Sequence, residues 1–220
     1  VLDSPAATAA WTDFPCVLKP ALGGSGSANV FIAQSAGELA ALAGYLLELS
    51  PQVVIEEYVG DPSSEYTVAV LRDMDGGLIN SIAIRRAILG GISNRLKVPN
   101  RTGRRELGPV LAISSGVSQG EIADFPEVRG ACEALAEGLD SRGPLNIQCR
   151  LHQGELVVFE INPRFSGTSL LRALAGFNEP DLLIRKHVLG EDIPIRFDYS
   201  FGTVVRGLSE VLYPSEPESS

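Results

Sequence analysis

The segment FEINPR, at residues 159–164, holds the side chains best suited to metal chemistry. Alternate residues of a strand share a face, so Glu160 and Asn162 point one way while Phe159 and Ile161 point the other way, into a core. A carboxylate and an amide oxygen on one face suit Mg²⁺, which takes hard oxygen ligands and completes its coordination with waters and phosphates. The segment therefore predicts a magnesium site, and an ordinary strand with a wet polar face is the alternative.

The segment NIQCR, at residues 146–150, alternates polar and apolar side chains in the same way. If the two segments pair as a hairpin, one face of the sheet gathers Gln148, Arg150, Glu160 and Asn162. A connecting turn of three residues sets Gln148 opposite Glu160, whereas a turn of four residues shifts the pairing by one. The sequence leaves this register open.

A glycine-rich loop follows Lys19 and is the second candidate site. Glycine lets backbone N–H groups approach phosphate oxygens closely, and the lysine supplies positive charge. The loop is not a Walker A loop, because no Gly-Lys-Ser/Thr follows, and it is not a GxGxxG motif. A flexible hairpin turn is the alternative interpretation. The loop residues are Gly23, Gly24, Ser25, Gly26 and Ser27.

The third candidate is a nucleotide-base site at residues 56–59, EEYV, with Glu65 downstream. A strand that leaves a core exposes backbone N–H and C=O groups, which can pair with the edge of an adenine. A carboxylate that follows, here Glu65, can accept hydrogen bonds from ribose hydroxyls. Two adjacent glutamates that merely end a strand at the surface are the alternative.

Basic residues cluster in a glycine-rich stretch at residues 85–105. Guanidinium groups bind phosphate and carboxylate in a bidentate manner. Arg86 and Arg95 stand out because they flank Gly90-Gly91, where backbone can approach a ligand. A solvated loop in an acidic protein is the simpler interpretation for the others, which are Arg85, Lys97, Arg101, Arg104 and Arg105. The lone histidines, His152 and His187, are predicted to be structural or exposed.

The elements that must position these residues follow from hydrophobic periodicity and turn signals. Ser35 and Glu38 form a predicted capping box, in which each side chain satisfies the backbone of the other residue at the first helical turn. No element is predicted for residues 86–120. Strands are predicted at 16–19, 30–33, 53–59, 65–71, 78–85, 145–151 and 156–161, and helices at 35–51, 126–139, 168–175 and 180–189. This order predicts an α+β fold with mainly antiparallel sheets.

The bulk composition excludes several classes of protein. The chain has 220 residues, 45% of them hydrophobic, and a net charge of −9 without a basic patch, so it is not expected to bind nucleic acid. No apolar run is long enough to span a membrane. The chain has an odd number of cysteines, Cys16, Cys132 and Cys149, and no CxxC spacing. This pattern indicates a reduced cytoplasmic protein without zinc or disulfides.

Taken in chain order, four segments resemble the ATP-grasp superfamily, and they are most similar to its carbamoyl-phosphate-synthase-like branch. The segments are FPCVLKPALGGSGSANV, VIEEYVGDPSSEYTVAV, GPLNIQCRL and ELVVFEINPRFSGTSLL, and they cover most of residues 14–175. The resemblance implies two α+β subdomains that grip a nucleotide between them. Residues 12–59 would form the lid, residues 60–213 the catalytic body, and residues 214–220 a disordered tail.

For the nucleotide, the resemblance implies that Lys19 contacts the ATP phosphates and that the glycine loop closes over them. Glu56, with the backbone of Glu57 and Val59, would hold adenine, and Glu65 would hold ribose. In this superfamily a further basic residue reaches ATP from before the lid, and an α/β domain precedes the lid. Neither is visible before Lys19, so an upstream α/β domain or chain is an expected partner.

For the chemistry, the resemblance implies one or two Mg²⁺ ions, or Mn²⁺ in their place. The metal ligands would be Gln148, Glu160 and Asn162. Arg164 would steady the γ-phosphate and the acyl phosphate, close to a helix start whose free N–H groups favour an anion. Arg86 would be a further anion ligand.

The function expected from the resemblance is that of an ATP- and Mg²⁺-dependent C–N ligase. A carboxylate or bicarbonate would be activated as an acyl phosphate and then attacked by an amine or ammonia. An ATP-binding regulatory module and a phosphotransferase on the same fold are the alternatives. The partners would be ATP, the carboxylate and the amine, and a homodimer is allowed. Without the upstream domain, residues 1–220 are expected to bind ATP weakly and to hydrolyse it slowly without ligation.

Overall fold

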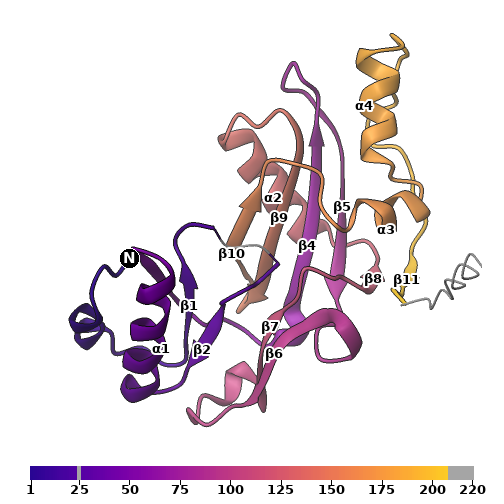
Figure 1. Ribbon diagram of the computed structural model, residues 1–220. Helices are drawn as coiled ribbons and strands as arrows, with labels where there is room; N and C mark the ends of the chain where they lie inside the picture. Colours follow the sequence, from indigo (N-terminus) through magenta and orange to yellow (C-terminus); the bar gives the residue numbers. More distant parts are fainter. Residues whose placement is uncertain (24–25, 208–220) are drawn as a thin grey trace, which may run out of the picture.

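Two antiparallel sheets and a short β-ribbon carry the strands of the structure (Figure 1). The computed structural model describes residues 1–23 and 26–207. The smaller sheet has the strand order β2-β1-β3, the larger sheet has the order β10-β9-β4-β5-β8-β11, and the ribbon pairs β6 with β7. Each of these pairings is antiparallel, which confirms the predicted α+β class.

The smaller sheet lies near the N-terminus and is covered on one face by α1 (Ala36–Leu49). Its strands are β1 (Cys16–Pro20), β2 (Phe31–Ala33) and β3 (Val53–Glu57). Leu18 from the sheet and Leu39 and Leu46 from the helix are fully buried between the two layers. The glycine-rich loop connects β1 to β2, so it extends from the end of a packed sheet (Figure 1).

The start of α1 confirms one half of the predicted capping box. The Ser35 hydroxyl accepts a hydrogen bond from the backbone N–H of Glu38 at 3.3 Å. The reciprocal half is wrong, because the Glu38 carboxylate accepts from the backbone N–H of Gln34 at 2.8 Å instead of that of Ser35. Glu38 also forms an ion pair with Arg101, which lies in the loop between the two strands of the ribbon.

The larger sheet has different helices on its two faces. Its strands are β4 (Glu65–Arg72), β5 (Leu78–Arg86), β8 (Gly120–Ile122), β9 (Gly143–His152), β10 (Glu155–Asn162) and β11 (Gly202–Val204). One face packs against α2 (Pro126–Gly138) through residues such as Val128. The other face packs against α3 (Ser169–Leu174) and the segment around α4 (Glu179–His187), where Phe177 is fully buried.

The face shared with α3 and α4 changes from apolar to polar along β4. In β4, alternate residues point to this face. Leu71 and Ala69 belong to the core beneath α3 and α4, whereas Thr67 and Glu65 come next on the same face and are buried polar groups. The polar end of this face is therefore the part of the sheet that is available for chemistry.

The hairpin of β9 and β10 differs from both turn lengths considered above. Its loop has two residues, Gln153 and Gly154, with positive φ angles of 52° and 84°, as in a type I′ turn. Phe159 is an extra residue, a β-bulge, that shifts the strand pairing by one. The bulge compensates for the shorter loop, so Gln148 still lies opposite Glu160.

The prediction that Phe159 and Ile161 point into a core is wrong. Ile161 is 39% exposed, and Phe159 is half-buried at the wall of a cavity. The physical reason is that β10 is the edge strand of the sheet and the bulge interrupts its alternation. The apolar residues of β10 that do pack on the α2 side are Leu156 and Val158.

Residues 86–120, for which no element is predicted, form the β-ribbon and lead into β8. The ribbon consists of β6 (Asn94–Pro99) and β7 (Val110–Ser114). Leu107 and Leu111 are fully buried with Tyr58 and Ile32, so the ribbon packs beside the smaller sheet. A 3-10 helix, Pro5–Ala10, is also absent from the predicted elements.

The other predicted strands and helices are confirmed, with ends that differ by at most two residues. The boundary between lid and body at residues 59 and 60 stays a prediction. The predicted tail at residues 214–220 lies outside the described residues. Among the residues that are described, no helix has the length and apolar character needed to cross a bilayer.

The backbone at Gly120 generates a first testable expectation. Gly120 pairs with Arg86 and has a φ angle of 151°, and a Cβ atom there would lie 2.0 Å from the carbonyl oxygen of Arg85. We expect Gly120→Ala to lower the free energy of unfolding by about 1–3 kcal/mol. Gly130→Ala is the matched control, because Gly130 lies exposed in α2 with open space around it, and alanine there should stabilise by about 1 kcal/mol. Urea unfolding followed by circular dichroism measures both, and wild-type stability of Gly120→Ala would contradict this backbone geometry.

Candidate active site

Two adjoining cavities contain the predicted site residues that the structure describes, apart from Gly23. The first, the mixed cavity, has an open volume of about 690 Å³, and the second, the polar cavity, has about 500 Å³. Ser27 and Glu160 line both, so the cavities meet at these two residues. Gly24 and Ser25 lie outside the described residues.

The mixed cavity lies between the smaller sheet, the ribbon and the edge of the larger sheet. Its apolar lining consists of Val17, Val30, Ile113, Val157 and Phe159. Val59 is a further apolar residue of the lining, and the polar lining consists of Lys19, Ser27, Glu56, Glu57, Tyr58, Glu65, Ser114, Arg150 and Glu160. A slot with apolar walls and a few polar groups suits a flat heteroaromatic ring with polar edges.

Lys19 joins the two sheets at the wall of the mixed cavity. Its Nζ atom lies 2.6 Å from Glu56 Oε1 and donates to the carbonyl oxygen of Phe159 at 3.3 Å. The side chains of Lys19 and Glu56 are 29% and 34% exposed, so both remain accessible from the cavity. Glu57 is more exposed and lies 3.6 Å from Arg104. The bulge at Phe159 therefore supplies the carbonyl oxygen that holds the lysine.

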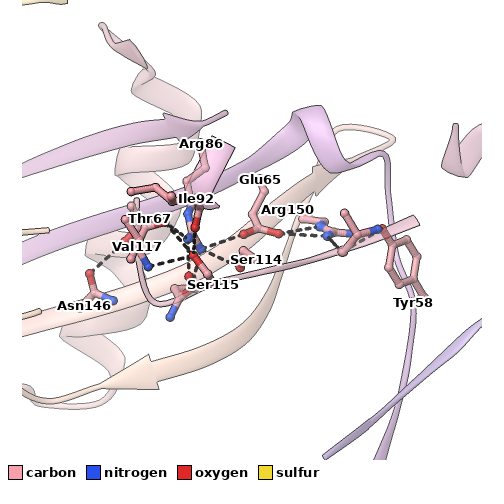
Figure 2. Close-up of polar contacts among 12 residues, drawn as sticks. Tyr58, Glu65, Thr67, Arg86, Ile92, Ser114, Ser115, Val117, Asn146 and Arg150 are labelled. Carbon is pink, nitrogen blue, oxygen red and sulfur yellow. Dashed lines mark hydrogen bonds and ion pairs between the residues drawn. The ribbon is translucent and has the colours of Figure 1, made fainter. Parts of the chain in front are cut away.

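A buried carboxylate, Glu65, lies between two arginines (Figure 2), and these three side chains line the two cavities. Glu65 Oε1 accepts from Arg86 Nη1 at 2.9 Å, and Glu65 Oε2 accepts from Arg150 Nε and Nη2 at 3.1 and 3.0 Å. All three side chains are at least nine-tenths buried. Because two guanidinium groups share one carboxylate, the cluster carries a net charge of +1, which favours an anion nearby. The predicted ribose contact of Glu65 stays a prediction.

Arg150 is a site residue to which the sequence assigns no role. Its guanidinium lies 4.6 Å from the centre of the Tyr58 ring and donates to the carbonyl oxygens of Val59 and Ala112 at 3.1 and 2.9 Å. It thereby holds the segment that follows β3 against the larger sheet. Burial lowers the pKa of Arg150, but the attraction and hydrogen bonding of Glu65 and Tyr58 together outweigh burial, so the net pKa lies above its ordinary value. The only sequence signal for it is its place in the alternating segment at residues 146–150.

Arg86 reaches the polar cavity from β5 and is fixed by its neighbours. Its Nη1 atom donates to Ser114 Oγ at 2.8 Å and to Gln148 Oε1 at 3.0 Å, and its Nη2 atom donates to the carbonyl oxygen of Ser115 at 2.7 Å. Burial lowers its pKa despite the opposing attraction of Glu65 and Glu160. Arg95, the other singled-out arginine, is exposed on β6 and lines neither cavity.

The predicted metal ligands lie together at the mouth of the polar cavity. Glu160 is exposed and pairs with Gln148 across the hairpin, and its Oε1 atom accepts from Asn162 Nδ2 at 2.7 Å. Asn162 Oδ1 accepts from Arg164 Nη2 at 3.3 Å. The described residues contain no cluster of three or more His, Cys, Asp or Glu side chains suited to a metal, so the oxygens of one carboxylate and two amides make up this set.

The polar cavity is also lined by residues that the sequence does not single out. Most carry a hydroxyl or an amide, or are glycines that expose backbone. They are Thr67, Ser115, Gly116, Ser118, Asn146, Ser166, Gly167 and Thr168. They come from β4, β9 and two loops, so no local spacing in the sequence links them.

His152 is half-buried at the hairpin turn, and His187 is exposed with its Nε2 atom 3.1 Å from Asp73.

Two known protein families match this chain, one in its N-terminal part and one in its C-terminal part. Residues 2–88 match the family described as the C-terminus of D-ala D-ala ligase, and residues 110–209 match the family described as ATP-grasp in the biosynthetic pathway with Ter operon. The chain belongs to the ATP-grasp superfamily. The fold and the matching families of this chain thus agree with the resemblance noted from its sequence.

Relatives of known name include a ligase and a synthase. A D-alanine–D-alanine ligase of Gloeobacter violaceus is 46% identical over 70 residues, which cover 32% of this chain and 21% of that protein. The large chain of carbamoyl phosphate synthase from Bifidobacterium animalis subsp. lactis is 29% identical over 170 residues, which cover 74% of this chain and 13% of that protein. This ATP-grasp chain therefore spans less than a quarter of the length of either relative.

Solved structures share the ATP-grasp fold at low sequence identity. Biotin carboxylase from Campylobacter jejuni, in complex with a β,γ-ATP analogue, superposes with a TM-score of 0.57 and 14% identity, over 86% of this chain and 40% of that chain. The biotin carboxylase domain of 2-oxoglutarate carboxylase from Hydrogenobacter thermophilus, in complex with MgADP and bicarbonate, superposes with a TM-score of 0.53 and 18% identity. The match covers 85% of this chain and 38% of that chain. At these identities the likeness shows the fold alone.

The buried cluster around Glu65 generates a second testable expectation. In Glu65→Gln, one neutral amide faces two buried guanidinium groups, so their desolvation is no longer compensated. We expect the free energy of unfolding to fall by about 3–5 kcal/mol. Glu121→Gln is the matched control, because Glu121 pairs with Arg85 at the surface and such pairs contribute about 0–1 kcal/mol. Equal losses for the two variants in urea unfolding at pH 7 would show that the Glu65 cluster is not a stabilising interaction.

Proposed function

We propose that the protein is an ATP- and Mg²⁺-dependent ligase that activates a carboxylate, or bicarbonate, as an acyl phosphate for attack by an amine or ammonia. The observation that carries this proposal is the junction of the two cavities at Glu160. Glu160, Gln148 and Asn162 lie there on the face of the larger sheet, and Lys19 reaches the same place from the smaller sheet. The arrangement has a place for a nucleotide on one side and for an acceptor on the other.

The mixed cavity is the proposed nucleotide site. Its apolar walls would hold adenine, and the backbone of Glu57 and Val59 would pair with the edge of the ring. Lys19 would contact the phosphates, with Glu56 beside it. Residues 12–59 would act as the lid and residues 60–213 as the catalytic body. The ATP analogue and MgADP in the two biotin carboxylase structures support ATP as the nucleotide.

The oxygen atoms at the mouth of the polar cavity fit Mg²⁺ in chemical type. The exposed carboxylate of Glu160 fits best, and the amide oxygens of Asn162 and Gln148 would complete the set. Gln148 Oε1 already accepts from Arg86, so only its second lone pair is available to a metal. When bound, Mg²⁺ would neutralise charge on the phosphates. Mn²⁺ would satisfy the same ligands.

The residues of the chain would favour transfer by position and charge. A carboxylate oxygen of the acid attacks the γ-phosphorus, the bond from that phosphorus to the β–γ bridging oxygen breaks, and ADP leaves. The amine then attacks the acyl carbon, orthophosphate leaves, and the amine loses a proton. Arg164 and the positive cluster of Arg86, Glu65 and Arg150 would stabilise the moving phosphoryl group. No protein nucleophile takes part in either step.

Product analysis against a panel of acids tests the proposal. The protein is incubated with MgATP, one small carboxylate or bicarbonate, and an amine or ammonia, and ADP and the coupled product are measured. Formation of one ADP for each coupled product supports the ligase. Phosphorylated acceptor as the final product would identify a phosphotransferase, and tight ATP binding without ADP release across the panel would identify a regulatory module.

Glu160 provides the third testable expectation. In Glu160→Gln the metal site loses its carboxylate, so phosphate charge is less well neutralised and Mg²⁺-dependent ADP release should fall about 100-fold or more. Glu155→Gln is the matched control, since Glu155 is exposed at the other end of β10. Its turnover should equal that of the wild type. ADP release by Glu160→Gln within a few-fold of the wild type would contradict the metal assignment.

Lys19 provides the fourth. A charge-assisted contact to a phosphate is worth about 1.5–3 kcal/mol, so Lys19→Ala should weaken ATP binding roughly 10- to 100-fold. The fold should be retained, because Lys19 is partly exposed and packs in no core. Lys97→Ala removes an equal charge from the exposed side of β6 and serves as the control. Calorimetry measures both affinities, and equal values for the two variants would remove Lys19 from the nucleotide site.

A further inference from the structure

The carboxamide of Asn146 has a fixed orientation in the wall of the polar cavity. Asn146 lies in β9 opposite Asn162 and is 3% exposed. Its Oδ1 atom accepts from Arg172 Nη2 at 2.6 Å and from Thr67 Oγ1 at 3.0 Å. If the amide were reversed, its NH₂ group would face the N–H groups of the guanidinium, which is a contact between donors. The oxygen therefore points to Arg172, and the NH₂ group points elsewhere.

Arg172 is a fully buried guanidinium behind the cavity wall. It lies in α3 with no exposed surface, and its Nη1 atom is 3.3 Å from Glu179 Oε2. Glu179 also accepts from the hydroxyl of Ser169 at 2.9 Å. A buried ion pair of this kind is often no more stabilising than apolar residues of the same volume. Stability alone thus does not explain an arginine at this position, whereas its contact with Asn146 gives it a specific task.

The NH₂ group of Asn146 is a donor with no acceptor among the described residues. Asn146 lines the polar cavity, and its Nδ2 atom is absent from the fully buried atoms that lack a partner, so the group reaches the cavity. Thr168 and Ser166 line the same cavity, and their hydroxyls bond each other, so this pair keeps one free hydroxyl proton. Free donors in a cavity wall suit oxygens that only accept hydrogen bonds, which are those of a carboxylate or a phosphate.

We propose that the Asn146 carboxamide binds the anionic group of the acid substrate, and that Arg172 is the positioning residue that turns its N–H groups into the cavity. This inference rests on the ligase function proposed above. The position of Asn146 favours the carboxylate over the phosphate, because Asn146 and Thr67 line only the polar cavity. The mixed cavity meets the polar cavity at Ser27 and Glu160, and Glu160 lies opposite Gln148, two residues along β9 from Asn146.

Asn146→Asp tests the binding role. The substitution is isosteric and keeps an oxygen for Arg172 and Thr67, but it places a negative oxygen where the NH₂ group was. We expect the KM for the acid to rise about 10-fold or more, and the KM for ATP to change less than about 2-fold. Asn178→Asp, at the exposed N-cap of α4, makes the same chemical change away from the cavity and should leave both constants unchanged. If Asn146 only completes the hydrogen bonds of Arg172, Asn146→Asp will also leave both unchanged, and the proposal is overturned.

A double-mutant cycle tests the positioning role. If Arg172 acts through Asn146, Arg172→Met raises the KM for the acid in the wild type and has little further effect in Asn146→Asp. Additive effects in the two backgrounds would overturn the positioning role. Should Arg172→Met fail to fold, as judged by circular dichroism, Arg172→Lys replaces it in the same cycle, because it keeps the charge but loses the two-pronged contact.

A binding measurement separates this inference from the ligase proposal. The side-chain NH₂ resonance of Asn146, assigned by its loss in Asn146→Asp, is followed in ¹⁵N-labelled protein during titration with acetate, with bicarbonate and with ATP or ADP. A shift with acetate or bicarbonate supports the carboxylate site, whether or not any acid of the panel is ligated. A shift with ATP but with neither ADP nor the two acids would assign Asn146 to the γ-phosphate and overturn the proposal. The absence of any shift in a protein that ligates would overturn it while leaving the ligase function intact.

Discussion

Glu65 accepts hydrogen bonds from two buried arginines, and the geometry of the site depends on where this carboxylate holds them. Arg150 leads to the segment after β3, where it bonds the carbonyl oxygen of Val59, and Arg86 leads to Gln148 in the polar cavity. Without the carboxylate between them, the two buried guanidinium groups would repel each other strongly, because the protein interior has a low dielectric constant. One charged cluster therefore ties the mixed cavity to the polar cavity and leaves a net positive charge between them.

Within the larger sheet, the site uses one face, and the strand period explains how a single face can serve both packing and chemistry. Along β4, Leu71 and Ala69 pack beneath α3 and α4, and Thr67 and Glu65 continue on the same face as cavity residues. The helices cover the apolar end, which leaves the polar end to meet the smaller sheet. The residues that would bind ligands therefore continue directly from the packed core on the same strand.

Alternation within a strand is a local property, and it correctly placed Gln148, Glu160 and Asn162 on one face. It could not reveal the bulge at Phe159, because a bulge depends on how a strand pairs with its neighbour; the two-residue turn was missed for the same reason. Contacts between residues far apart in the sequence could not be predicted from local patterns either. The partnership of Glu65 with Arg150, and that of Asn146 with Arg172, arise only when β4, β9 and α3 pack together. Thr67 joins the site through the same packing, and Ser114 joins it from β7, where its hydroxyl accepts from Arg86.

Transfer of an oxygen atom from the acid to phosphate tests the proposed chemistry most directly. The protein is given MgATP, an amine and an acid labelled with ¹⁸O in both carboxylate oxygens, and the released orthophosphate is examined by mass spectrometry. Activation as an acyl phosphate requires one ¹⁸O atom in each orthophosphate released with coupled product. Orthophosphate whose new oxygen comes only from water would contradict it, because phosphoryl transfer would then have taken place without the carboxylate.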